Sequence, residues 1–124
     1  MAAGDSTYLE SDGKSVNVSL LYTVPAHKVA YVDGWLGITA QSGDSGSSVA
    51  LQIDDREYQF TVPSGLSVAK GDTVYITLAT VTGHIPDDAA YTTTSGTGKV
   101  ALFKATAAKD GNNVVTGKLR LGGV

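Results

Sequence analysis

The chain has 124 residues, a length that fits one domain large enough to bury a single hydrophobic core. Its net charge of −3, from 9 basic and 12 acidic residues without a basic run, gives no indication of a nucleic-acid partner. Cysteine is absent, which excludes disulfides, thiolate nucleophiles and cysteine-bound zinc.

Charged residues make up only 17% of the chain, so Ser, Thr, Asn and Gly must supply much of the surface. Such a surface repels other proteins weakly and suits a protein that spends its life docked. No apolar run approaches the ~20 residues of a membrane span, and the N-terminus lacks the basic and apolar regions of a signal peptide. We therefore expect no membrane partner, and synthesis in a cytosol.

Alternation of apolar and polar residues dominates the first half of the chain and predicts β-strands. A first strand, which ends before Pro25, places four apolar side chains on one face: Val16, Val18, Leu20 and Tyr22. The next run, residues 28–40, contains Gly34 and Gly37, and interior glycines indicate a bulge, a bend or close backbone approach. Residues 41–48 have the composition of a loop.

Residues 49–62 alternate on both sides of Asp54 and Asp55, which predicts a hairpin. Residues 68–78 read as a tight turn followed by a half-buried strand, with Val74, Ile76 and Leu78 facing the core. Residues 83–98 form a longer irregular stretch, which we expect at the surface.

Three elements complete the chain: a strand at residues 99–107, a turn at 110–113 and a closing strand at 114–121. The alanines of 101–108 also favour a helix, but the neighbouring Val, Leu and Phe residues fit a strand better. The sum predicts an all-β, single-domain β-sandwich or small β-barrel of about seven to eight short strands over residues 15–124. Residues 1–14 are predicted to form an N-terminal arm.

Two short motifs resemble catalytic signatures. Residues 43–46 read Gly-Asp-Ser-Gly, as around a serine-protease nucleophile, but that chemistry also needs a positioned histidine, a carboxylate and an oxyanion hole. Residues 96–99 resemble part of a phosphate-binding loop, yet Thr93 stands where the first glycine is needed and Val100 where Ser or Thr is needed. Turn chemistry explains the first run, and the second lacks required residues and a following helix, so we predict a protein that is not an enzyme and has no cofactor.

His27 and His84 lie in predicted loops, and two histidines fall short of the three or four ligands of a typical zinc site. We interpret them as exposed polar loop residues. The acidic residues around Asp54 and around Asp87 lack the spacing of a calcium loop and are interpreted as solvated turns. Trp35 could stack on a sugar or anchor an interface, with burial in the core at least as well supported.

The order of several weak motifs is more informative than any one of them. A segment around Gly34 and Gly37, then a glycine-rich loop, precedes an alternating strand that ends in Val62-Pro63. A Gly-Asp-Thr-Val-Tyr run at 71–75 follows, then an alanine-rich segment, a polar turn and a final strand with Val, Leu, Lys and Arg. From about residue 26 to 121 this order resembles the small phage capsid decoration proteins, or cement proteins, grouped under a domain family of formerly unknown function (DUF2190).

The resemblance implies a structural virion protein on the outer surface of the capsid, made in the cytoplasm of a bacterial host. Proteins of this kind bind an assembled shell and clamp neighbouring major capsid subunits. They usually act as small symmetric oligomers, so a homotrimer is expected, with a dimer as the alternative. The expected contact lies in the N-terminal arm, at Ser6, Thr7, Tyr8 and Leu9. A frayed terminus is an equally supported interpretation of those residues.

The sequence leaves two other functional classes of protein open. A carbohydrate-binding or adhesin-like β-domain of a phage tail or fibre predicts an exposed aromatic platform, with Trp35 beside Tyr31 or Tyr91. A small hydrolase predicts a cleft that joins a histidine to Asp or Ser.

Overall fold

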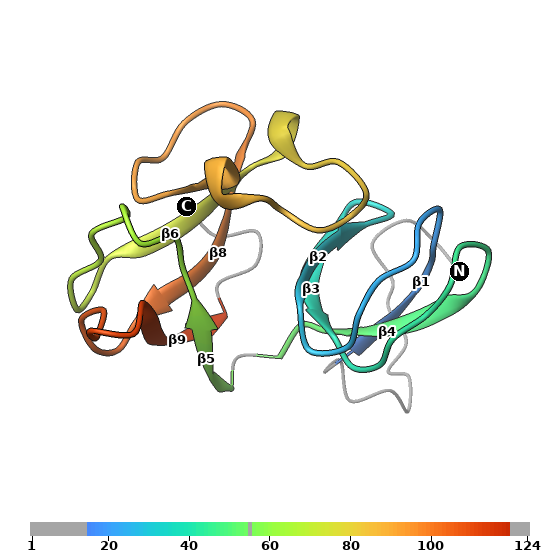
Figure 1. Ribbon diagram of the computed structural model, residues 1–124, viewed down its shortest axis with the longest axis horizontal. Helices are drawn as coiled ribbons and strands as arrows, with labels where there is room; N and C mark the ends of the chain where they lie inside the picture. The colour runs from blue at the N-terminus through green and yellow to red at the C-terminus, as the bar shows by residue number, and fades with distance from the viewer. Residues whose placement is uncertain (1–14, 55, 120–124) are drawn as a thin grey trace, which may run out of the picture.

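The structure is a computed structural model that describes residues 15–54 and 56–119. Ser6, Thr7, Tyr8 and Leu9 lie outside the described residues, as do the last two residues of the predicted closing strand. The described chain is all-β, with nine strands in two antiparallel sheets that do not close into a barrel. The prediction of an all-β fold is confirmed in its sandwich form and not as a barrel, with nine described strands where seven to eight were expected. Figure 1 shows the two sheets side by side.

The first sheet has the strand order β1-β4-β3-β2. Its strands are β1 (Ser15–Ser19), β2 (Val29–Val32), β3 (Trp35–Thr39) and β4 (Ser48–Gln52). The predicted run 28–40 is a hairpin of β2 and β3, because Asp33 and Gly34 form a two-residue turn with φ angles of 53° and 81°. Gly37 permits the predicted close approach: a Cβ there would lie 2.8 Å from the Gln52 carbonyl oxygen.

The second sheet has the order β5-β9-β8-β6-β7. Its strands are β5 (Glu57–Thr61), β6 (Thr73–Thr77), β7 (Tyr91–Thr92), β8 (Lys99–Ala105) and β9 (Val114–Leu119). Between β6 and β7 lie two 3₁₀ turns, η1 (Leu78–Thr80) and η2 (Asp88–Ala90). The strand predicted for the alanine-rich segment at residues 99–107 is confirmed by β8. The turn before β9 is also confirmed, where the Asp110 carboxylate accepts bonds from the Asn112 and Val114 amides.

The hairpin predicted for residues 49–62 is wrong. β4 pairs with β1 and β3 in the first sheet, whereas β5 pairs with β9 in the second. The chain between them crosses from one sheet to the other, as the green segment between β4 and β5 in Figure 1 shows. Alternation marks both strands correctly, but it carries no information about which strand is the neighbour of which.

Two hydrophobic clusters hold the fold together. The smaller cluster lies on one face of the first sheet and includes Val18, Val32 and Leu51. The larger cluster is formed mainly by side chains of the second sheet, and it also contains Leu36 and Ile38 of β3. Because β3 contributes these side chains to the core of the other sheet, the two sheets pack against each other through the larger cluster.

The run at residues 68–78 contains the predicted turn and strand, but the strand ends at Thr77, and Leu78 lies in η1, partly buried against the larger cluster. Gly71 has a φ of 91°, and the Asp72 carboxylate accepts a bond of 2.9 Å from the Ala69 amide, so the two residues form the turn. Val74 and Ile76 are fully buried in the larger cluster, which anchors β6 between β8 and β7. This run is a scaffold element.

Candidate functional site

Three large hydrophobic side chains are exposed among the described residues: Leu21 (74% exposed), Tyr22 (53%) and Trp35 (46%). We call them the apolar surface set. Leu21 and Tyr22 follow the end of β1, and Trp35 is the first residue of β3. Exposed Trp and Tyr side chains are typical of binding surfaces, because their burial by a partner releases much apolar area.

The sequence placed Tyr22 on the buried face of the first strand, and that prediction is wrong. β1 ends at Ser19, so the alternation with Val18 and Leu20 no longer governs the direction of the Tyr22 side chain. Core burial of Trp35, one of the two interpretations left open, is wrong as well. Trp35 lies beside the tight turn at Gly34, and its side chain remains 46% exposed there.

His84 holds the segment with Leu21 and Tyr22 against the first sheet. Its Nε2 accepts a bond of 3.0 Å from the Leu21 amide, and its Nδ1 lies 3.1 Å from the Tyr31 carbonyl oxygen. These partners require the neutral imidazole with its proton on Nδ1. The Tyr22 ring also packs edge-on against the imidazole, with 5.1 Å between ring centroids.

The prediction that His84 is an exposed loop residue is therefore wrong. His84 is partly buried, has a φ of 74°, and its own carbonyl accepts a bond of 2.8 Å from the Tyr31 amide. His27 is exposed as predicted. The described residues contain no group of three or more His, Cys, Asp or Glu side chains that could hold a metal ion.

The protease-like run at 43–46 is a structural turn, as predicted. The Ser45 hydroxyl donates a bond of 2.9 Å to the Leu21 carbonyl, and Gly46 has a φ of 90°. The run therefore fixes the backbone at Leu20 and Leu21. The Asp33 carboxylate assists by accepting a bond of 2.8 Å from the Ser19 amide.

The aromatic platform expected for a carbohydrate-binding domain does not form with the predicted partners. Tyr31 pairs with Leu36 and packs against the larger cluster, whereas Trp35 pairs with Val32 and so points to the other face of the hairpin. Tyr91 lies in β7 of the second sheet and packs against the larger cluster as well.

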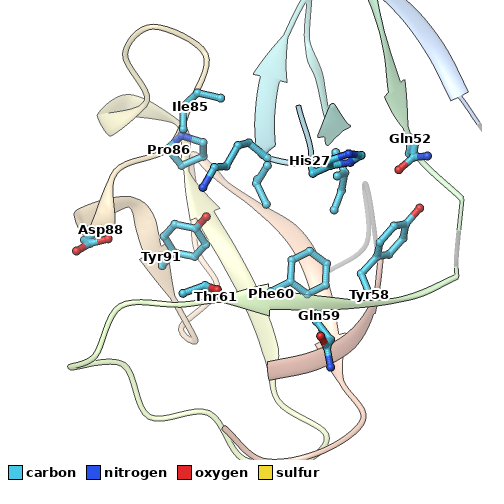
Figure 2. A pocket seen from close by; sticks show the side chains of 13 residues that line it. His27, Gln52, Tyr58, Gln59, Phe60, Thr61, Ile85, Pro86, Asp88 and Tyr91 are labelled. Carbon is cyan, nitrogen blue, oxygen red and sulfur yellow. The ribbon is translucent and has the colours of Figure 1, made fainter. Parts of the chain in front are cut away.

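A cleft of about 340 Å³ lies between the two sheets (Figure 2). One wall comes from His27, Ile38 and Gln52 of the first sheet and its loops, and another from β5. Tyr91 lies at the far end of the cleft, where burial, and then the charge of Asp88, raise the pKa of its hydroxyl to about 12. Tyr91 is therefore a neutral hydroxyl at neutral pH.

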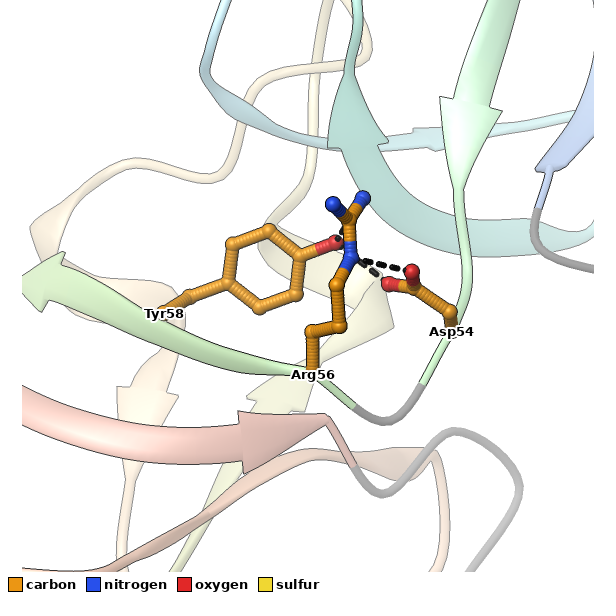
Figure 3. Close-up of polar contacts among 3 residues, drawn as sticks. All are labelled: Asp54, Arg56 and Tyr58. Atoms are coloured by element: carbon orange, nitrogen blue, oxygen red, sulfur yellow. Dashed lines mark hydrogen bonds and ion pairs between the residues drawn. The ribbon is translucent and has the colours of Figure 1, made fainter.

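Asp54, Arg56 and Tyr58 join in a polar cluster where the chain crosses between the sheets (Figure 3). The Asp54 carboxylate is only 8% exposed and accepts bonds from the Arg56 guanidinium and the Tyr58 hydroxyl. Burial, and then the bond to Asp54, raise the pKa of Tyr58. The bond to Asp54 is also the main cause that raises the pKa of Arg56.

The interpretation of Asp54 as part of a solvated turn is wrong, because its two partners replace water in a largely buried position. No signal in the sequence distinguishes this carboxylate from Asp55 or Glu57. The cluster fixes the crossing segment, and its donors and acceptors satisfy one another. We assign it a structural role.

The described surface thus offers an exposed apolar set and an open cleft on a rigid β-scaffold. The family of phage cement proteins matches this chain over residues 2–121. The chain belongs to the phage cement protein family. Its role is accordingly structural, in association with the phage capsid. Neither a search of curated proteins nor a search of solved structures finds a match.

Family membership confirms the resemblance inferred from the ordered motifs, including the run at 71–75. The sequence predicted neither Leu21 nor Tyr22 as surface residues. A weak signal was present, because the hydroxyl of Tyr22 and the nearby Pro25 both argue against a buried strand there. Among the described residues no helix is long and apolar enough to cross a membrane.

Proposed function

We propose that this cement protein binds the outer surface of the assembled capsid and stabilises it by clamping neighbouring major capsid subunits. The family match over residues 2–121 is the observation that carries the proposal. The fold supports it, because two packed sheets with most polar groups satisfied make a rigid body that can hold two subunits at a fixed spacing.

Stabilisation follows from preferential binding to the assembled shell. A ligand that binds only the assembled state adds RT ln(1 + [L]/Kd), or about 2.7 kcal/mol per site at a hundredfold excess over Kd. A copy that spans two subunits binds the second with a high effective concentration. We propose a homotrimer, with a dimer as the alternative, because an oligomer multiplies this gain.

The proposed contacts come from two regions. The first is the N-terminal arm with Ser6, Thr7, Tyr8 and Leu9, which could add a strand to the edge of a capsid sheet. The second is the apolar surface set, whose three side chains would lose their contact with water on docking. We propose no catalytic step for this protein.

The test is co-sedimentation of the purified protein with empty capsids and with free capsid subunits, together with its mass in solution. We expect binding to shells only, and a higher temperature of shell disruption when the protein is bound. Deletion of residues 2–9 should abolish shell binding and leave the β-domain folded. Equal binding to shells and to free subunits would contradict the clamp, and unchanged binding after the deletion would contradict the arm contact.

A further inference from the structure

The outer edge of β5 carries backbone groups that point away from its partner strand. The Val62 amide donates a bond of 2.9 Å to the Asn113 carbonyl, which fixes the phase of the β5–β9 ladder. Because bonded and non-bonded pairs alternate in an antiparallel ladder, Phe60 and Tyr58 bond to β9. The amide and carbonyl groups of Gln59 and Thr61 therefore point to the opposite side, where no described residue bonds to them.

Some of the comparable groups at the edges of the first sheet are covered. At the edge of β2, the amide and carbonyl groups of Tyr31 both bond to His84. At the edge of β1, the amide of Ser19 bonds to the Asp33 carboxylate. Folded proteins commonly cover their edge strands because an open edge recruits another strand. The described residues provide no such cover for the outward groups of Gln59 and Thr61 in β5.

The cleft between the sheets runs along this same edge. Figure 2 shows Tyr58 and Phe60 on the side of β5 that faces His27, and Gln59 on the opposite side. Gln59 and Thr61 nevertheless line the cleft, so it is the edge of their backbone that borders it. The first sheet and Tyr91 bound the cleft on its other sides. A single extended segment fits such a space. A second sheet does not, because a sheet packed against another occupies a layer about 10 Å thick.

The chain itself supplies a segment at the right place. Ser15, the first residue of β1, pairs with Gln52, and Gln52 lines the cleft. Ser15 therefore lies at the end of the first sheet that borders the cleft. Glu57 follows Gln52 by only five residues, so β5 begins at this same end. A segment that entered the cleft from Ser15 would lie antiparallel to β5.

The sequence of the arm suits a strand. Thr7, Tyr8 and Leu9 are residues that strands accept well, and they alternate between two faces. The five residues from 10 to 14 include Asp12 and Gly13, which favour a turn. The six residue steps from Leu9 to Ser15 can span about 20 Å, which exceeds the length of a five-residue strand.

We propose that the outer edge of β5 is the docking site for residues 7–10 of the same chain, which add to the second sheet as an antiparallel strand. This strand would satisfy the outward groups of Gln59 and Thr61 and fill the cleft. The arm would then be held on β5 in the free protein, and the capsid contact proposed above would require its release.

The test is residue-resolved amide hydrogen exchange in the full chain and in the chain without residues 2–9. We expect the amides of Gln59 and Thr61 to exchange at least tenfold faster after the deletion. The amides of Tyr58 and Phe60, bonded to β9, are the internal control and should not change. A peptide of residues 6–11 added to the shortened chain should restore slow exchange at Gln59 and Thr61.

Equal exchange of Gln59 and Thr61 in the two proteins would overturn the proposal. The mass in solution identifies the donor of the strand: a single-chain mass with protected amides supports docking within one chain. A larger mass that falls to a single chain on deletion, together with loss of protection, would place the arm on a second copy and overturn the assignment. None of these measurements involves the capsid, so their outcome is independent of the clamp.

Discussion

Gly117 of β9 makes room for the ring of Phe103 on the neighbouring strand β8. A Cβ at position 117 would collide with Cδ2 of that ring and would also lie 2.8 Å from the Lys104 carbonyl oxygen. The same ring stacks on Phe60 of β5, with 4.1 Å between centroids and 2° between planes. A glycine in the middle strand thus allows two aromatic rings to pack across three strands.

Gly117→Ala should destabilise the protein by about 1–3 kcal/mol, because a rigid backbone atom as well as the ring must move. Urea unfolding measures the effect. Gly111→Ala is the matched control, since a Cβ at that position has no neighbour within 4 Å. Equal free energies of unfolding for the two variants would contradict the close packing.

His84→Ala should lower the free energy of unfolding by about 1–2 kcal/mol more than His27→Ala does. Both histidines have positive φ angles, 74° and 59°, so the backbone strain of alanine is similar in the two variants. Only the first substitution removes the bonds to the Leu21 amide and the Tyr31 carbonyl. Denaturant unfolding of the two variants side by side gives the difference, and a difference near zero would show that these bonds contribute nothing.

Tyr91 should make the protein less stable at alkaline pH. Burial raises its pKa to about 12, whereas an unfolded tyrosine has a pKa of about 10. Between these values the unfolded chain has lost a proton that the folded chain retains. The free energy of unfolding therefore falls as pH rises, by up to about 1.4 kcal/mol per pH unit.

Tyr91→Phe removes this contribution and should give a shallower decline of stability across the same pH window. Some decline should remain, because the pKa of Tyr58 is also raised. Phenolate absorbance offers a direct check, since a tyrosine titration near pH 12 should disappear in the variant. Superimposable stability curves above pH 10 would argue against the burial of this hydroxyl.

Tyr58→Phe should cost about 1–2 kcal/mol of stability, because the largely buried Asp54 carboxylate loses one of its two donors. Tyr22→Phe removes a hydroxyl from a side chain that is 53% exposed and should have an effect near zero. Thermal unfolding at neutral pH compares the two. Similar melting temperatures for both variants would show that the Asp54 cluster does not stabilise the crossing segment.

The apolar surface set should contribute to capsid binding without stabilising the fold. Leu21→Ser and Trp35→Ala should each weaken shell binding about tenfold or more, as expected for exposed side chains that a partner buries. The free energy of unfolding of Leu21→Ser should stay within about 0.5 kcal/mol of the parent value, because that side chain is 74% exposed. Ser95→Ala, an exposed position in the loop before β8, is the control. Full binding by both variants would remove this surface from the proposed contact.

Most of the strands could be predicted from sequence because the alternation of side chains is a local property. The buried pair Val74 and Ile76 in β6 and the turn at Asp110 follow from residues a few positions apart. The family could also be inferred from the order of short motifs. The extent of the N-terminal arm, its contacts and the oligomeric state stay predictions.

The sequence by itself determined an all-β chain, its strand-forming segments and its membership of the phage cement proteins. Only the tertiary structure decided that β4 and β5 lie in different sheets, that His84 supports Leu21 from 63 residues away, and that Trp35 is exposed. The reason is that alternation defines which side chains share a face, whereas strand pairing and burial depend on contacts between segments far apart in the chain.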